Sequence, residues 1–197
     1  TDEKLTQISS TDTAHGGNDD IDLGNGDKTV IGGVGEDTVD AAKGQHRVIG
    51  DNGSIAYAAG ALRSMTSDAH ANGGKDTISL KGDVNQVIAG SGDDTVTVTT
   101  ASSTDHVMGD NGTMTYTGAE GSEALTNMQS DIPNGVSETG GDDTITLGSG
   151  DKVVIAGKGN DTVKTTVTSV GNRVVLGDEG EIDYDDSLKL ETVKSTS

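Results

Sequence analysis

The stretch "AGSGDDTVTV", Ala89 to Val98, places two glycines two positions apart, an aspartate two residues after the second glycine, and then a Thr-Val pair. Two variants of it, "GGVGEDTV" and "AGKGNDTV", begin at Gly32 and at Ala156. Glycine permits tight turns, whereas valine and threonine favour strands. The stretch therefore predicts a glycine turn that bears a carboxylate and leads directly into a short strand.

These variants are parts of longer repeats. Aligning the glycine pairs that begin at Gly16, Gly73 and Gly140 brings three copies into register, and each copy continues to a "GDNG" or "GDEG" motif and a tyrosine. A further motif, Leu-x-x-(Met/Ile/Val), occurs at Leu5/Ile8, Leu62/Met65, Leu125/Met128 and Leu190/Val193. We therefore interpret the chain as a slice of one continuous array, with the end of a preceding unit (1–15) and three repeat units (16–72, 73–139 and 140–197).

The composition limits the classes of fold and partner. The 197 residues include 30 Gly but no Cys, Trp or Phe, so a core built on aromatic side chains is not expected. Acidic residues number 33 against 13 basic ones, which gives a net charge of −20. This charge argues against nucleic acid and anionic membranes as partners and favours a cation. No apolar run approaches the roughly 18 residues of a membrane helix, so we expect no membrane insertion.

Apolar β-formers recur within each unit at a spacing of nine residues, as at Ile21, Val30 and Val39. Strands this short need stacked neighbours for stability. We therefore expect an all-β fold, a parallel β-solenoid in which two strands and two turns make one coil. Counting strands onward through Val48 and Ile55 predicts six short strands, and so three coils, in each unit of about 60 residues.

The glycine-aspartate turns resemble the nonapeptide Gly-Gly-x-Gly-x-Asp-x-(apolar)-x of RTX (hemolysin-type) calcium-binding proteins. The wider unit is similar to the repeats of giant filamentous surface adhesins of bacteria. The resemblance implies a parallel β-roll in which several Ca²⁺ ions sit in the glycine turns, bound by aspartates and main-chain carbonyls. The candidate carboxylate ligands are Asp19, Asp37, Asp51, Asp76, Asp94, Asp110, Asp143, Asp161 and Asp178. The candidate carbonyls lie near Gly17, Gly33, Gly35, Gly74, Gly90, Gly92, Gly141, Gly157 and Gly159.

Charge gives a separate reason to expect a cation. Stacked coils would hold these carboxylates a few Å apart, at a cost on the order of 1 to 4 kcal/mol per pair. The middle nonapeptide of each unit departs from the family pattern, because Lys28, Asn85 and Lys152 stand where the aspartate is expected. We therefore expect all the candidate carboxylates on one edge of the solenoid and metal-free surface turns on the other, where Lys152→Asn should have little effect.

These observations favour a calcium-binding structural repeat in the stalk or filament of a large secreted or cell-surface bacterial protein. Open strand edges at the two ends also suggest head-to-tail self-association. One alternative is an RTX-type domain for calcium-dependent folding and secretion of an exported toxin or hydrolase. Another is an ice-binding solenoid, suggested by "TVTVTT" from Thr95 to Thr100, although the first unit does not reproduce that run. We expect no enzymatic activity, because the prominent acids all belong to the repeat and no catalytic motif is present.

Overall fold

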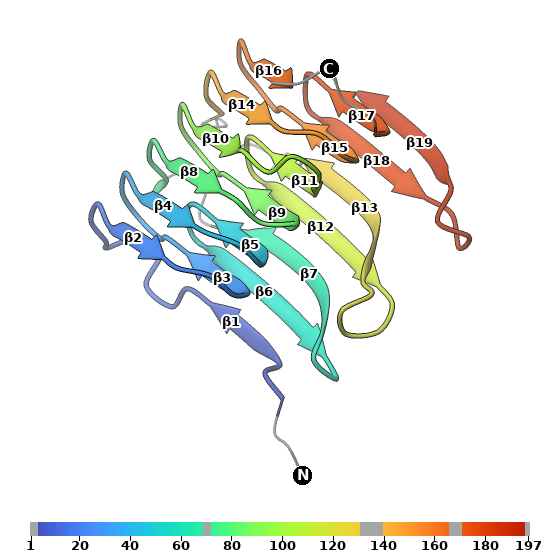
Figure 1. Ribbon diagram of the computed structural model, residues 1–197. Coiled ribbons are helices and arrows are strands. Elements are labelled where there is room, and N and C mark those ends of the chain that lie inside the picture. The colour runs from blue at the N-terminus through green and yellow to red at the C-terminus, as the bar shows by residue number, and fades with distance from the viewer. Residues whose placement is uncertain (1–3, 69–71, 131–139, 166–170, 196–197) are drawn as a thin grey trace.

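The computed structural model describes residues 4–68, 72–130, 140–165 and 171–195. The end of the second predicted unit, residues 131–139, lies outside the described residues. The described ranges contain 19 strands in three sheets, stacked from the N-terminal to the C-terminal end of the chain (Figure 1). In this part of the chain no helix is long and apolar enough to cross a membrane.

Two of the sheets are parallel, and the chain alternates between them. The first, which we name the outer sheet, comprises β2 (Asp20–Leu23), β4 (Thr38–Ala41), β8 (Thr77–Leu80), β10 (Thr95–Val98), β14 (Thr144–Leu147) and β16 (Thr162–Thr165). The second, the middle sheet, comprises β3 (Lys28–Ile31), β5 (Gln45–Ile49), β9 (Val84–Ile88), β11 (Thr104–Met108), β15 (Lys152–Ile155) and β17 (Arg173–Leu176). This all-β architecture with stacked parallel strands confirms the coarse prediction and is compatible with a β-solenoid.

The third sheet is antiparallel, and the prediction of a third parallel coil in each unit is wrong. This sheet, which we name the hairpin sheet, comprises β1 (Gln7–Ser9), β6 (Gly53–Ala58), β7 (Ala61–Ser67), β12 (Gly112–Thr117), β13 (Ala124–Ser130), β18 (Gly180–Tyr184) and β19 (Leu190–Ser195). The connection explains the error. Ala59 and Gly60 alone separate β6 from β7, both with positive φ (53° and 86°), and so short a turn joins antiparallel strands only.

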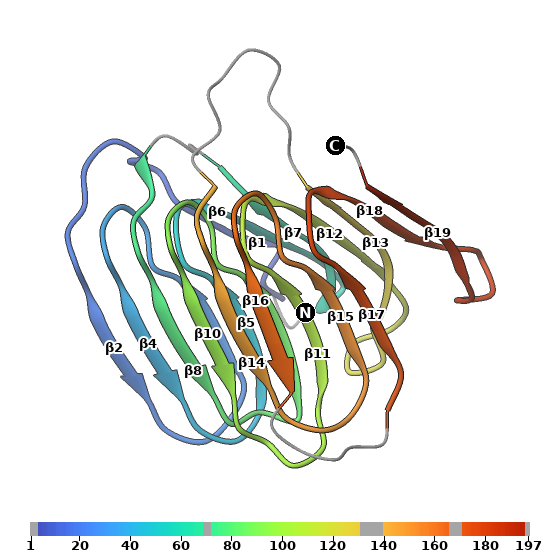
Figure 2. The same cartoon turned by 90° about the horizontal axis from the view of Figure 1, so that it is seen from above.

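The middle sheet lies between the other two (Figure 2) and shares a core with each of them. Outer-sheet strands such as β10 alternate half-buried and buried residues, because one face meets the core and the other meets water. In contrast, all four residues of β15 are buried, as is typical of parallel strands covered on both faces. The first core consists of aliphatic side chains, mostly valine, whereas the second also contains methionines such as Met65 and Met114.

Strand register supports the alignment of the repeats. Ile55 pairs with both Ile8 and Met65, and Ile182 pairs with both Met128 and Val193. The last residue of the Leu-x-x-(Met/Ile/Val) motif therefore occupies one equivalent position in β1, β7, β13 and β19.

Candidate metal centre

Six aspartates form a continuous ladder at the turns that lead into the outer sheet. Each residue immediately precedes an outer-sheet strand, so the parallel pairing stacks the six turns. The backbone N–H of each aspartate donates to Oδ1 of the next one. These bonds run from Asp19 to Asp37 (2.8 Å), Asp37 to Asp76 (2.7 Å), Asp76 to Asp94 (2.7 Å), Asp94 to Asp143 (2.8 Å) and Asp143 to Asp161 (2.9 Å). We name this set the aspartate ladder.

In five of these six aspartates, the second carboxylate oxygen is buried and has no hydrogen-bond partner among the residues that the structure describes. Asp94, in the middle of the ladder, is 2 % exposed. Oδ2 accepts no hydrogen bond in Asp37, Asp76, Asp94, Asp143 and Asp161. An unsatisfied buried polar group costs about 1–3 kcal/mol, and more when it is charged. Five such oxygen atoms in stacked turns therefore favour a cation-binding site over turns that bind no ligand.

Burial raises the pKa of each of these five carboxyl groups, and neighbouring aspartates raise it further. The pKa of Asp94 reaches about 10, and the pKa values of Asp76 and Asp143 reach about 8. Burial also raises the pKa of Asp37 and Asp161. With protein groups alone, the centre of the ladder thus favours neutral carboxylic acids at pH 7.

Backbone carbonyls lie close to the unpartnered oxygens. A Cβ atom built on Gly50 would lie 2.2 Å from Oδ2 of Asp76 and 2.3 Å from the carbonyl oxygen of Ala89. The same pair of contacts recurs one unit later, where a Cβ on Gly109 would lie 2.2 Å from both Oδ2 of Asp143 and the Ala156 carbonyl oxygen. Glycine is therefore required at both positions, and each leaves a carboxylate oxygen and a carbonyl oxygen facing the same space.

This donor set fits a hard cation. It consists of oxygen atoms only, it is anionic when ionised, and it mixes carboxylates with carbonyls, as calcium sites do. Within the described ranges, no three carboxylate, histidine or cysteine side chains gather as a metal cluster on their own. A cation on the ladder would therefore be shared between neighbouring aspartates and would take its remaining ligands from the backbone or water.

Asp51 and Asp110, also predicted as ligands, have a different environment. The Asp51 carboxylate accepts hydrogen bonds from the backbone N–H groups of Gly74 (3.1 Å) and Ser91 (2.5 Å), both in the following unit. Asp110 does the same with Gly141 (3.2 Å) and Lys158 (2.5 Å). Both carboxylates thus hold two glycine turns of the next unit together. The Asp51 charge still raises the pKa of Asp76 and Asp94, so it lies close to the aspartate ladder.

The remaining predicted ligands lie at the two ends of the stack. Asp19, the first residue of the aspartate ladder, and Asp178, the equivalent of Asp51 and Asp110 in the third unit, are both exposed. Six of the nine predicted turn glycines adopt a positive φ, which glycine allows without steric cost: Gly33, Gly35, Gly90, Gly92, Gly157 and Gly159. The Gly50 carbonyl oxygen lies beside Oδ2 of Asp37, since a Cβ on Gly32 would lie 2.2 Å from the first and 2.5 Å from the second. The carbonyl groups of Gly50, Ala89 and Ala156 were not predicted as ligands, because they precede or begin the motif that the sequence pattern marks.

At the opposite edge, side-chain donors of the protein itself reach the turn carbonyls. Lys28 Nζ donates to the carbonyl oxygens of Asn25 and Gly26, both at 2.8 Å. Asn85 Nδ2 donates to the carbonyl oxygen of Gly82 at 3.0 Å. At this edge, side chains of the protein therefore already donate hydrogen bonds to these turn carbonyls.

Lys152 is the strongest example, and the expectation that it is a surface residue is wrong. Its side chain is 1 % exposed and forms an ion pair with Asp105, Nζ to Oδ2, at 2.9 Å. Nζ also donates to the carbonyl oxygens of Ser103 and Ser149, both at 2.7 Å. The sequence signal that was missed is Asp105 itself, which aligns with Lys152 in the neighbouring strand.

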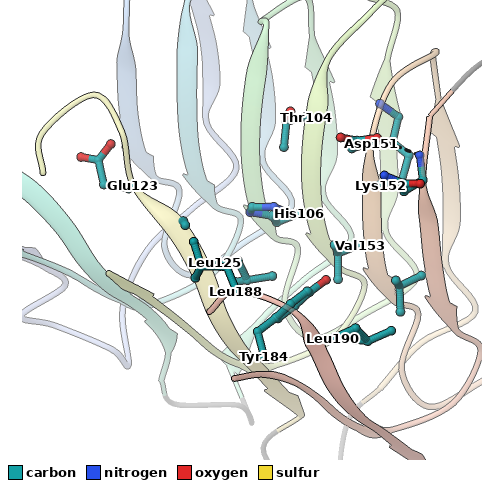
Figure 3. A pocket seen from close by; sticks show the side chains of 13 residues that line it. Thr104, His106, Glu123, Leu125, Asp151, Lys152, Val153, Tyr184, Leu188 and Leu190 are labelled. Atoms are coloured by element: carbon teal, nitrogen blue, oxygen red, sulfur yellow. Dashed lines mark hydrogen bonds between the residues drawn. The ribbon is translucent and has the colours of Figure 1, made fainter. Parts of the chain in front are cut away.

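One cavity, of about 640 Å³, lies between the middle sheet and the hairpins β13 and β18–β19 (Figure 3). Its apolar wall includes Leu125, Tyr184 and Leu190. Burial lowers the pKa of His106, at its floor, to about 4, and His106 Nδ1 lies 3.2 Å from the Tyr116 hydroxyl. The ring of this buried histidine is therefore already engaged by a side chain of the protein.

Comparison with known proteins gives no match to this chain among family models, curated protein sequences or solved structures.

Proposed function

We propose that this chain is a calcium-stabilised structural repeat, an RTX-like β-roll that serves as a rigid segment of a large secreted or cell-surface bacterial protein. The observation that supports the proposal most strongly is the aspartate ladder, with five buried carboxylate oxygens that accept no hydrogen bond from any described residue. The net charge of −20 supports it as well, because bound cations would offset the repulsion within the stack.

Calcium would be held by Oδ2 of the buried ladder aspartates, with the Gly50, Ala89 and Ala156 carbonyls beside them. The ion would supply positive charge in a place where burial otherwise forces the carboxyl groups to take up protons. Metal binding and folding would then be coupled, because the unfolded chain has no preformed site. Extracellular modules commonly bind calcium with dissociation constants of about 10⁻⁴ to 10⁻³ M, which suits a protein outside the cell.

A pair of adjacent aspartates tests this proposal. Asp94→Asn should shift the midpoint of calcium-induced folding at pH 7.5 to at least about tenfold higher calcium, since it removes a charged ligand from the middle of the ladder. Asp93→Asn, which removes the same charge from an exposed neighbour, should shift the midpoint far less. Circular dichroism during a calcium titration measures both midpoints. Equal shifts in the two variants would rule out the ladder as the binding site.

A second candidate function, ice binding, gains support from one feature of the outer sheet. The first unit does not repeat "TVTVTT", yet five of the six outer-sheet strands carry a threonine at one shared cross-strand position. Thr38, Thr77, Thr95, Thr144 and Thr162 are consecutive cross-strand neighbours. Neighbouring strands lie about 4.7–4.9 Å apart, so their hydroxyl and methyl groups form a regular file on a face that meets water. A thermal-hysteresis measurement of the calcium-loaded protein tests this candidate, and freezing without hysteresis would eliminate it.

A further inference from the structure

We propose that the cavity between the middle sheet and the hairpins β13 and β18–β19 binds a cation that carries a short apolar chain, such as an alkylguanidinium or the side chain of an arginine. Its volume of about 640 Å³ falls within the range of about 300–1,000 Å³ that is typical of small-molecule sites (Figure 3). Residues of the second and third units line it, so it lies between two neighbouring units of the stack. The site needs the fold but does not rest on calcium binding.

Short side chains of the third unit open this space. One cross-strand position of the middle sheet faces the hairpin sheet, and each unit contributes two residues to it. In chain order these residues are Thr29, Arg47, Gln86, His106, Val153 and Val174. The third unit therefore has two valines where the first unit has an arginine and the second has a glutamine and a histidine. The cavity thus results from the identity of these residues.

Arg47 in the first unit shows what this position accommodates. Its guanidinium lies 5.8 Å from the centroid of the Tyr57 ring, and its Nη2 lies 3.9 Å from Oε1 of Glu123. The Arg47 side chain is 12 % exposed, so the protein covers most of its aliphatic part. An aromatic ring and a carboxylate each stabilise a guanidinium. The protein therefore holds a cation at this position wherever a side chain is long enough to supply one.

Both kinds of contact recur on the wall of the cavity. Tyr184, the equivalent of Tyr57 in the third unit, lines the cavity, and so does Glu123. Among the described residues, the only hydrogen bond to the Glu123 carboxylate comes from the Leu62 backbone N–H, which donates to Oε1 at 3.1 Å. Oε2 is therefore left to accept hydrogen bonds from a bound cation. The apolar part of the wall, which includes Leu125, would cover the apolar chain of the ligand.

The charges around the cavity favour a cation over an anion. Glu123 and Asp151 are the acidic residues of its lining. Lys152 is the basic one, but it is 1 % exposed and pairs with Asp105 at 2.9 Å, so its charge is already offset. Burial lowers the pKa of His106 to about 4, so this ring adds no positive charge at pH 7. The net charge of −20 acts in the same direction, because it attracts cations from solution.

Isothermal titration calorimetry of the full chain in saturating calcium, with butylguanidinium as the probe, measures this binding. Butylguanidinium should bind at least about tenfold more tightly than 1-butanol or butyrate, which have the same alkyl chain but no positive charge. N-acetylargininamide carries the same group on a peptide backbone. If it binds as well, the site admits an arginine side chain of a partner protein, and if it does not, the site takes free small cations. Butylguanidinium that binds no more tightly than butyrate would overturn the proposal.

Three variants locate the binding. Glu123→Gln should weaken butylguanidinium binding by about tenfold or more, because it removes the charge that the cation faces. Glu120→Gln removes the same charge from an exposed position of the same loop and should leave the affinity unchanged. Val153→Gln, which introduces the residue that the second unit has at this position, should abolish binding by filling the cavity. Circular dichroism verifies the fold of each variant, and the comparison of ligands on the unchanged chain does not depend on them. Equal losses in the two glutamate variants, or full binding by Val153→Gln, would contradict the proposal.

Discussion

Replacing Lys152 by methionine is expected to destabilise the protein by about 3–5 kcal/mol, since removing one partner of a buried ion pair leaves the other charge uncompensated. Asp105, the partner, is fully buried, and it also accepts a hydrogen bond from Asn85 Nδ2 at 2.7 Å. Methionine fills a similar volume to lysine, so the loss reports mainly on charge and hydrogen bonding. Urea unfolding in saturating calcium measures the change.

Two further variants make this result specific. Lys28→Met removes an equivalent lysine whose hydrogen bonds lie nearer the surface, and it should cost no more than about 1 kcal/mol. Adding Asp105→Asn to Lys152→Met should restore much of the lost stability by removing the uncompensated charge. A Lys152→Met protein as stable as the unchanged chain would show that the internal ion pair does not support this edge.

Without calcium, the stability of the folded protein is expected to fall as the pH rises from about 4 to about 8. Burial raises the pKa of Asp76 and Asp143 to about 8 and that of Asp94 to about 10, well above the unfolded value near 3.9. The folded protein therefore binds more protons than the unfolded chain. The stabilisation that these carboxyl groups allow is fully present below pH 4, and it is lost as the pH rises through the folded pKa values. The slope is about 1.4 kcal/mol per pH unit for each such carboxyl group. Circular dichroism in chelator between pH 5 and pH 8 measures this fall, as a loss of β-sheet signal toward pH 8.

The same experiment separates the roles of proton and metal at Asp94. Asparagine resembles the protonated acid, so Asp94→Asn should stabilise the chelated protein at pH 8 while weakening its response to calcium. Calcium should reverse the pH dependence in the unchanged chain, because metal binds the ionised form. Stability in chelator that rises between pH 5 and pH 8 would contradict the buried, unpartnered state of these carboxyl groups.

The aspartate ladder could be predicted from sequence because a period of about nine residues and a parallel stack determine the register together. Asp37 and Asp94 follow the same glycine pattern, and the turns superpose once their strands pair. The alternation between the edge with the aspartate ladder and the edge with Lys28, Asn85 and Lys152 follows from the same count, since successive turns fall on opposite edges of a coil.

The antiparallel hairpins, the buried position of Lys152 and the hydrogen bonds of Asp51 could not be predicted, because they depend on contacts that the repeat pattern does not encode. The turn at Ala59 and Gly60 resembles the glycine turns in composition, yet its two-residue length makes β6 and β7 antiparallel. Lys152 looked like a surface residue because its partner, Asp105, belongs to a different nonapeptide and becomes adjacent only through the pairing of β11 with β15. The Asp51 carboxylate accepts hydrogen bonds from backbone N–H groups in two separate turns of the next unit. No local sequence pattern therefore predicts that Asp51 joins these turns.

The most direct test of calcium binding on the aspartate ladder is anomalous diffraction from crystals grown in calcium, measured at a long wavelength where calcium scatters anomalously. We expect density peaks at about 2.3–2.6 Å from Oδ2 of Asp76, Asp94 and Asp143. Calcium-loaded crystals with the same fold and no anomalous peak near those three oxygens would contradict it.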